Sequence, residues 1–315
     1  MLKRIFGVMC AVLLLLLCVY AVFFFRFDAP ARSEVAPTPT AAPPTATPTP
    51  PKLSVPDTLE IQSVSAVLMR LGGEILFDKN GGKRVYPASL TKIMTAVVAL
   101  ENLDDLNELI TLRRELYADI YTTHASVAGF EAGDEASVSD LLYGLMLPSG
   151  AECAYALAER VAGTIPAFTE LMNDKAEELG MDGTHFVNAT GLHDDNHYST
   201  AWDMAALLEY ALQNGTFYEL FTAKSHIAAP TKSHPVGLAF ESLLFSNVKN
   251  PVFPGGELLG GKTGYTNEAE LCLASLAERD GERLILITCG APDLDKSRTA
   301  NIADALLIYG AVAQG

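Results

Sequence analysis

A serine and a lysine three positions apart, Ser89 and Lys92, are the first pair in this sequence whose side chains could perform covalent chemistry. A helix that begins near Pro87 would place both on one face, because residues three apart are neighbours on a helix surface. A serine hydroxyl becomes nucleophilic when a base takes its proton, and a buried lysine can be that base. The spacing alone is common, and a helix N-cap serine followed by a surface lysine explains it equally well.

A second group of candidate residues is the run Lys262-Thr263-Gly264, which two glycines precede and Tyr265 follows. On an extended segment the ammonium of Lys262 and the hydroxyl of Thr263 could bind a carboxylate. Gly264 would allow another backbone to approach closely. The alternative is a glycine-rich turn that carries a solvated lysine.

Ser149 is the third candidate, in the short segment Leu147-Pro148-Ser149-Gly150. The apolar pattern before it is helical and starts at Ser137-x-x-Asp140, which resembles a capping box. We therefore expect a loop between two helices that presents Ser149 beside the lysine.

The elements that would hold these residues are two hairpins with helices between them. Residues 63–80 alternate around Gly72-Gly73, and residues 271–290 surround Asp280-Gly281, a strong type I′ turn signal. Apolar spacings of three and four predict helices over Leu90 to Leu100, Leu141 to Met146, Ala151 to Val161, Phe168 to Leu179, Met204 to Leu212 and Asn301 to Val312. Distant strands that share one sheet predict an α/β (α+β) fold with a mainly antiparallel sheet, flanking helices and a helical insert.

The first 52 residues are expected to lie outside the folded domain. Residues 5–25 are uncharged and would span about 32 Å as a helix. Lys3 and Arg4 before them favour a cytoplasmic N-terminus, so residues 1–30 are interpreted as a single-pass membrane anchor with the rest of the chain outside the cytoplasm. A cleaved signal peptide is the alternative. Residues 31–52 form a Pro/Thr/Ala-rich linker, and residues 53–315 form the catalytic domain.

The net charge bears on the possible partners of this protein, and the positions of the cysteines bear on a possible disulfide. The net charge is −16, and the first 52 residues hold five basic against two acidic residues, so the remainder carries −19. A nucleic-acid partner is therefore not expected. In the hairpin register Cys272 and Cys289 face each other, and we expect two free thiols there, with a disulfide as the alternative.

A metal site is not expected in the histidine-containing stretch 193–197. Its two histidines fall in a loop without helical spacing, unlike the ligands of a zincin helix. Thr200 and Asp203, which follow, resemble the capping box of the next helix.

Taken in order, Ser89-x-x-Lys92, Ser149-Gly150 and Lys262-Thr263-Gly264 resemble the active-site set of penicillin-binding proteins and serine β-lactamases. Four longer stretches resemble the D-alanyl-D-alanine carboxypeptidases, the low-molecular-weight penicillin-binding proteins: YPASLTKIMTA, DLLYGLMLPSG, FVNATGLHDDNHYSTAWDMA and GGKTGYTNEA. This resemblance covers roughly residues 54 to 295. It implies a β-lactamase/transpeptidase-like fold and an enzyme that removes the terminal D-alanine from peptidoglycan stem peptides. It also implies acylation by β-lactam antibiotics, and no cofactor.

The resemblance also implies a role for each matched residue. Ser89 would form the acyl ester, Lys92 would be its general base and Ser149 would relay a proton. Lys262, with Thr263 and Gly264 beside it, would bind the substrate carboxylate. The backbone N–H groups of Ser89 and Tyr265 would form the oxyanion hole.

One position departs from the family pattern. The second motif usually reads Ser-x-Asn, and here its third residue is Ala151, which has no side-chain amide. Turnover would be slower, or Glu152 would take over the missing role. A β-lactamase or esterase on the same fold, and a weakly active wall-binding module, therefore remain alternatives; the β-lactamase needs a deacylating carboxylate that the sequence does not show.

Overall fold

The centre of the structure is a six-stranded antiparallel sheet with the strand order β3-β2-β11-β10-β9-β8. The structure, a computed structural model, describes residues 53–56, 58–123, 125–248 and 250–314. The strands of this sheet are β2 (Ser65–Arg70), β3 (Ile75–Lys79), β8 (Val252–Phe253), β9 (Gly256–Thr266), β10 (Glu270–Arg279) and β11 (Glu282–Ala291). Strands from both ends of the domain therefore share one sheet, as the sequence predicts.

Both predicted hairpins form, with the turn residues that the sequence indicates. Asp280 and Gly281 have φ angles of 49° and 83°, the left-handed conformation that both central residues of a type I′ turn need. Gly72 and Gly73, between β2 and β3, have φ angles of 111° and 91°. The positive φ angles explain why glycines stand at these turns.

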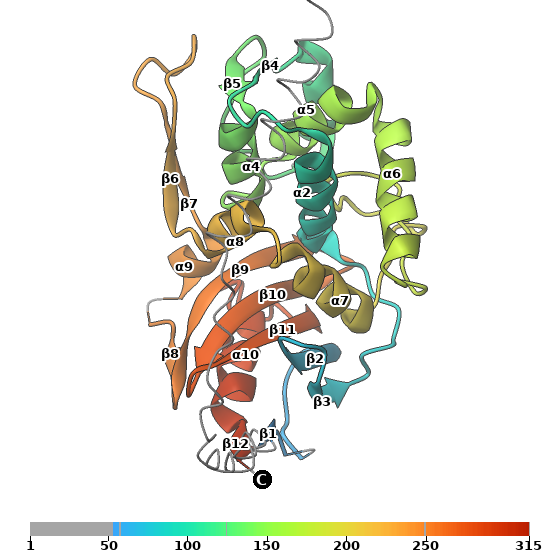
Figure 1. The fold of residues 1–315 in the computed structure, drawn as a ribbon, viewed down its shortest axis with the longest axis vertical. Helices are drawn as coiled ribbons and strands as arrows, with labels where there is room; N and C mark the ends of the chain where they lie inside the picture. The colour runs from blue at the N-terminus through green and yellow to red at the C-terminus, as the bar shows by residue number, and fades with distance from the viewer. Residues whose placement is uncertain (1–52, 57, 124, 249, 315) are drawn as a thin grey trace, which may run out of the picture. The chain divides into compact units, whose positions relative to one another are not determined.

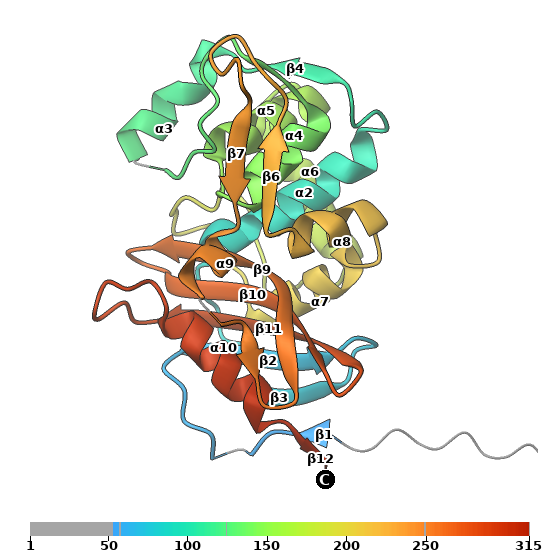
Figure 2. The same cartoon turned by 90° about the vertical axis from the view of Figure 1, so that its left-hand side faces the viewer.

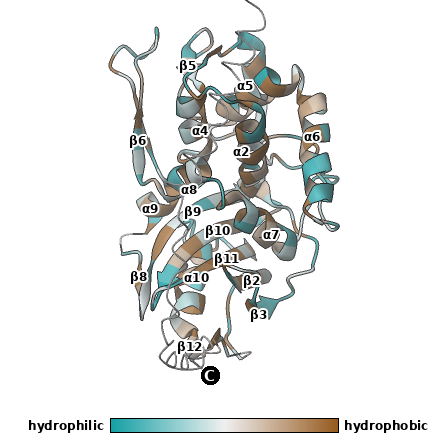
Figure 3. Cartoon of the chain, viewed as in Figure 1, coloured by the Kyte–Doolittle hydropathy of each residue, from teal (hydrophilic) through white to brown (hydrophobic). Residues whose placement is uncertain are grey.

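The central strands are buried on both faces, and their alternate residues enter different cores. On β2, Val67 packs into the core on the helical side, whereas Leu68 packs into the core on the opposite side. On β11, Ile287 packs into the core on the helical side, and Leu286 packs into the core on the opposite side. Figure 3 accordingly colours much of β10, β11 and the inner helix α2 as hydrophobic, while β3 at the sheet edge ends in the hydrophilic residues Asp78 and Lys79. Burial on both faces explains the nearly continuous apolar sequence of these strands.

Helix α10 (Ala300–Ala311) covers one face of the sheet, and the helical part of the domain covers the other (Figures 1 and 2). At the centre of the helical part lies α2 (Thr91–Asn102), which is buried at every residue from Thr91 to Ala99. Around it are α3 (Tyr117–Thr123), α4 (Val138–Met146), α5 (Ala151–Ala162), α6 (Ile165–Glu178), α7 (Ala201–Ala211) and α8 (Gly215–Thr222). The six helices that the sequence predicts correspond to α2, α4, α5, α6, α7 and α10, and their predicted bounds agree with the structure to within a few residues.

Short elements complete the domain, and the sequence pattern did not indicate most of them. They are the 3-10 turns η1 (Ala88–Leu90) and η2 (Arg114–Leu116), the helix α9 (Leu243–Asn247), and the pairs β1 (Leu53–Ser54) with β12 (Ala313–Gln314), β4 (Leu109–Thr111) with β5 (Glu135–Ser137) and β6 (Ser225–Ala228) with β7 (Leu238–Glu241). The sequence pattern does not indicate helices α3 and α8 either. Elements this short carry too few residues for a periodic pattern.

Both expected helix caps are present. The Ser137 hydroxyl accepts from the N–H of Asp140, and the Thr200 hydroxyl accepts from the N–H of Asp203, each at 3.0 Å. Cys272 and Cys289 are buried free thiols, as expected.

The expected anchor, residues 1–30, and the linker, residues 31–52, lie outside the described residues. Within the residues that are described, no helix combines the length and the apolar character needed to cross a bilayer.

Candidate active site

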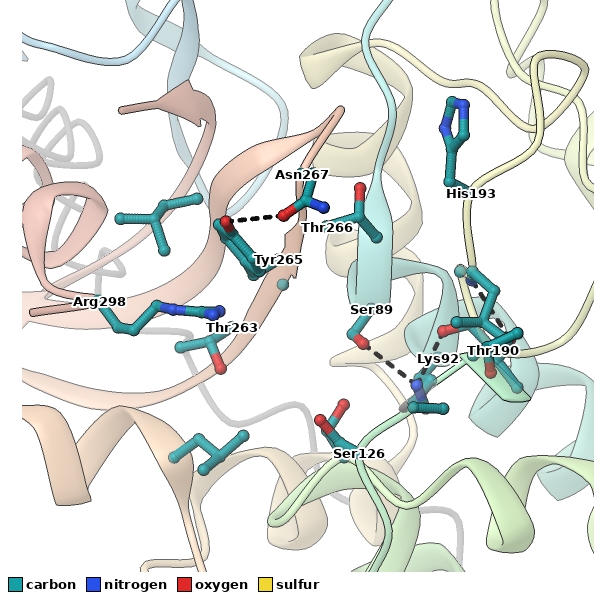
Figure 4. Close-up of a pocket in the computed structure, with 18 of the residues that line it drawn as sticks. Ser89, Lys92, Ser126, Thr190, His193, Thr263, Tyr265, Thr266, Asn267 and Arg298 are labelled. Atoms are coloured by element: carbon teal, nitrogen blue, oxygen red, sulfur yellow. Dashed lines mark hydrogen bonds between the residues drawn. The ribbon is translucent and has the colours of Figure 1, made fainter. Parts of the chain in front are cut away.

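Ser89 and Lys92 lie side by side at the start of α2, as their spacing predicts. Ser89 is the middle residue of η1, and Lys92 follows in the first turn of α2. The Lys92 amine donates to the Ser89 hydroxyl over 3.1 Å and to the Thr190 carbonyl over 2.8 Å (Figure 4). Burial lowers the pKa of Lys92 to about 7, while the charge of Glu152 acts against this fall. A large fraction of Lys92 is therefore neutral near pH 7 and able to accept a proton.

The Thr190 carbonyl is held by a strap, residues 187–192, that crosses over the Ser89 turn. The side-chain oxygen of Asn188 accepts from the N–H groups of Thr190 and Gly191. A Cβ on Gly191 would lie 1.8 Å from the Ala88 carbonyl oxygen, so only glycine fits there. The strap thus fixes the acceptor that orients the Lys92 amine.

His197 joins this strap to α2. Its Nδ1 accepts from the N–H of Val187 over 3.1 Å, so the proton is on Nε2, which donates to the Thr91 hydroxyl over 2.7 Å. Burial lowers the pKa of His197 to about 4, so the ring is neutral at ordinary pH.

Among the described side chains, no group of three His, Cys, Asp or Glu is arranged to hold a metal ion.

Lys262, Thr263 and Gly264 lie on β9, beside the Ser89 turn. The Lys262 amine is buried and donates to the Ser149 hydroxyl over 2.8 Å and to the Thr263 carbonyl over 2.9 Å. Burial, and secondly the charge of Lys92, lower the pKa of Lys262. A Cβ on Gly264 would lie 3.1 Å from the Ser89 nitrogen, so glycine allows β9 to approach the turn. The expected close approach at Gly264 is confirmed.

Ser149 lies in the loop between α4 and α5, as predicted, with only 2% of its surface exposed. Its φ angle is 68°, which is uncommon for a residue other than glycine. The hydroxyl contacts the amine of Lys262. The three sequence motifs therefore meet in space although they lie far apart in the chain.

The motif residues surround a pocket of about 770 Å³. Its lining includes Ser89, Lys92, Ser149, Thr263 and Tyr265, together with residues to which the sequence assigns no role, among them Ser126, Thr190 and Arg298. Figure 4 shows Thr263, Tyr265 and Arg298 on one side of Ser89, and Lys92 and Thr190 on the other. Residues from both sides of Ser89 therefore line the same pocket.

Arg298 is the most exposed basic side chain among the described lining residues. Its guanidinium lies 3.5 Å from the centre of the Tyr265 ring and forms an ion pair with Asp293 at 3.1 Å. About half of the side chain is exposed (49%). Arg298 follows β11 in a loop, and no local pattern marks it. By contrast, Lys262 is 1% exposed and lies behind Ser149.

Glu152 does not replace the missing amide of the second motif, so that expectation is corrected. One oxygen of its carboxylate accepts from the N–H groups of Ala128 and Gly129, at 2.6 Å and 2.8 Å. The carboxylate is thus bound to a loop and makes no hydrogen bond to Lys92 or Ser149. Ala151 is fully buried, and its N–H donates to the Ser126 carbonyl.

A family model described as D-alanyl-D-alanine carboxypeptidase matches residues 50–293. This chain belongs to that family. The D-alanyl-D-alanine carboxypeptidase DacF of Bacillus subtilis is 34% identical over 246 residues, which are 78% of this chain and 61% of that protein. The D-alanyl-D-alanine carboxypeptidase of Streptomyces sp. strain K15 is 32% identical over 234 residues, which are 71% of this chain and 79% of that protein.

Solved structures of this carboxypeptidase family have the same fold. The crystal structure of the Streptomyces K15 DD-transpeptidase aligns with a TM-score of 0.70 at 32% identity, covering 80% of this chain and 98% of that one. The D-alanyl-D-alanine carboxypeptidase DacD of Francisella tularensis aligns with a TM-score of 0.65 at 28% identity, covering 79% and 70%. The chain thus spans about three fifths of the B. subtilis relative, and nearly all of the Streptomyces structure.

Proposed function

We propose that this chain is a serine-type D-Ala-D-Ala carboxypeptidase that removes the terminal D-alanine from peptidoglycan stem peptides. The observation that carries the proposal is the Lys92 amine, which lies 3.1 Å from the Ser89 hydroxyl and has a pKa of about 7 inside an open pocket. A serine beside a base that is neutral at working pH meets the requirement for nucleophilic catalysis. Membership of the carboxypeptidase family supports the same conclusion.

In the acylation step, Ser89 Oγ attacks the carbonyl carbon of the penultimate D-alanine as Lys92 takes the hydroxyl proton. The backbone N–H groups of Ser89 and Tyr265 stabilise the oxyanion, in line with the close approach of β9 to the Ser89 turn. The peptide bond then breaks, and its nitrogen receives the proton that Lys92 took from Ser89, passed on by way of Ser149. D-Alanine leaves, and water hydrolyses the ester to restore Ser89.

The terminal carboxylate of the substrate is bound by the Thr263 hydroxyl and by the cations of the pocket. Lys262 supplies positive charge from behind Ser149, and Arg298 offers the exposed guanidinium. Arginine can bind a carboxylate through two parallel hydrogen bonds. A carboxypeptidase needs this contact because its substrate ends in a free carboxylate.

A β-lactam antibiotic would acylate Ser89 by the same attack, and this provides the test. Incubation with penicillin should add the mass of the drug to the wild-type protein, and peptide mapping should locate the ester on Ser89. Ser89→Ala should not be labelled, while it should melt at the wild-type temperature. Equal labelling of the Ser89→Ala variant would show that another residue is the nucleophile. In parallel, release of D-alanine from a D-Ala-D-Ala peptide separates a carboxypeptidase from a module that only binds the wall.

We further propose that the enzyme works outside the cytoplasm, tethered by a single membrane span at residues 5–25 and held away from the bilayer by the linker of residues 31–52. The apolar run and the basic residues before it support this orientation. The full chain should sediment with membranes and be digested by protease added outside intact cells. A soluble full-length chain, or protection from that protease, would contradict the proposal.

A further inference from the structure

Glu152 is a buried carboxylate that the proposed chemistry does not use. It is the second residue of α5, three positions after Ser149, and its side chain is inaccessible to solvent. One carboxylate oxygen receives both hydrogen bonds, from the N–H groups of Ala128 and Gly129. The second oxygen is buried and has no hydrogen-bond partner among the residues that the structure describes. A buried carboxylate with a single bonded oxygen is costly, which suggests a function beyond packing.

The segment that Glu152 holds is a wall of the active-site pocket. Ser126 lines the pocket together with Ser89 and Lys92 (Figure 4), and its carbonyl accepts from the N–H of Ala151 over 2.8 Å. The segment also packs tightly against the turn after α4, since a Cβ on Gly150 would lie 2.9 Å from the Cβ of Ala128. Residues 126–129 are therefore fastened to the helix start that directly follows Ser149.

Glu152 is also the acidic group that acts on Lys92 from within the protein. The other titratable groups around the Lys92 amine are Cys153 on α5, Lys262 on β9 and His197, which follows the strap in the chain. His197 is neutral at ordinary pH, and burial raises the pKa of the Cys153 thiol, so that it carries no charge. Burial raises the pKa of Glu152 as well, and the N–H groups of Gly129 and Ala128 act against that rise. Glu152 is thus the acidic side chain whose negative charge favours the protonated form of Lys92.

We propose that Glu152 is a positioning residue for acylation: its carboxylate fixes the Ser126 wall of the pocket and provides the buried counter-charge of the general base. The inference rests on the proposed function, because it assigns to Lys92 the role of base. Glu152 touches neither substrate nor nucleophile. Its effect must therefore act through the loop that it binds and through the electrostatic effect of its carboxylate on Lys92.

Two variants separate the loop contact from the charge. Glu152→Gln keeps an acceptor oxygen for Ala128 and Gly129 but removes the charge. Glu152→Ala removes both. Glu159→Gln is the matched control, because Glu159 lies two turns further along α5 and pairs with Arg113 at the surface. Steady-state kcat and KM are measured on a D-Ala-D-Ala peptide over neutral and acidic pH, together with the melting temperature of each variant.

The deciding measurement is the acid limb of the pH profile, the range over which kcat/KM falls as the pH is lowered. Without the opposing carboxylate, the protonated form of Lys92 is less favoured, so its pKa falls and the limb of Glu152→Gln should move to lower pH with KM within about twofold of wild type. Glu152→Ala should lose about tenfold to a hundredfold in kcat/KM, because the wall is released. Glu159→Gln should match wild type in both respects. An acid limb of Glu152→Gln that coincides with the wild-type limb overturns the proposal, whether or not Glu152→Ala folds.

Failure of the proposed function itself would be seen in the activity of the wild-type protein, not in the variants of Glu152. If the wild-type protein neither releases D-alanine nor reacts with penicillin, the proposed function fails. If the wild-type protein is active and only the Glu152→Gln limb stays in place, the role of Glu152 fails alone.

Discussion

The amine of Lys262 donates a hydrogen bond to the hydroxyl of Ser149 over 2.8 Å, although 113 positions separate the two residues in the chain. Both groups are buried, and the pKa of Lys262 is lowered by burial and by the charge of Lys92. A proton carried by Ser149 can therefore be replaced from Lys262 without passing through bulk water. The second and third motifs form one unit, in which the lysine supports the proton relay.

This coupling predicts non-additive losses. Ser149→Ala and Lys262→Met should each reduce kcat/KM on a D-Ala-D-Ala peptide by about a hundredfold or more, because each breaks the same relay. The double variant should lose little more than the worse single variant. Rates for all four proteins form a double-mutant cycle. Losses that multiply in the double variant would mean that the two residues act independently.

Lys92 predicts the pH dependence of acylation. Below its pKa of about 7 the amine is protonated and cannot accept the Ser89 proton, so kcat/KM should rise with pH through about 7 and then level off. Lys92→Arg stays protonated throughout and should lose at least about a hundredfold at every pH. A pH series of penicillin acylation rates measures the same limb. A wild-type profile that is flat through neutral pH would exclude Lys92 as the base.

Arg298 predicts a preference for substrates that end in a carboxylate. Arg298→Gln should lower kcat/KM on an acid-ended peptide by about tenfold to a hundredfold, the worth of a charge-assisted contact of about 1.5 to 3 kcal/mol. An amide-ended peptide should already be a poor substrate and should change little. Arg84→Gln is the control, because Arg84 lies over the Tyr198 ring and does not line the pocket. Equal loss on both peptides would refute a carboxylate contact for Arg298.

Ala151 predicts a gain of function. Ala151→Asn restores the amide of the family pattern, and one added hydrogen bond near 1.4 kcal/mol should raise kcat/KM by up to about tenfold. Glu152 will not compete with the new side chain, because its carboxylate is bound to Ala128 and Gly129. Ala151 is fully buried, so the melting temperature must be recorded with the rate. An intact melting temperature without any gain would show that the absent amide does not limit turnover.

Much of the fold could be read from local sequence. The hairpin at Asp280-Gly281 was predictable because few residues other than Asn, Asp and Gly adopt positive φ angles at both turn positions. The helix starts at Ser137 and Thr200 were predictable because a short polar side chain caps the N–H three residues ahead. Ser89 and Lys92 could be placed together because a single helical turn joins them. In each case the deciding interaction lies within a few residues.

Only the tertiary structure decided which of these groups meet and how they are charged. The sequence could not show that Lys262 contacts Ser149, that Arg298 enters the pocket or that Glu152 binds the loop at Ala128, because each contact joins segments that local patterns do not relate. Nor could it show that Lys92 has a pKa of about 7, since that value arises from burial by helices and strands packed around it. Sequence supplied the chemical groups and their order. The three-dimensional packing determined their distances, their exposure to water and hence their protonation.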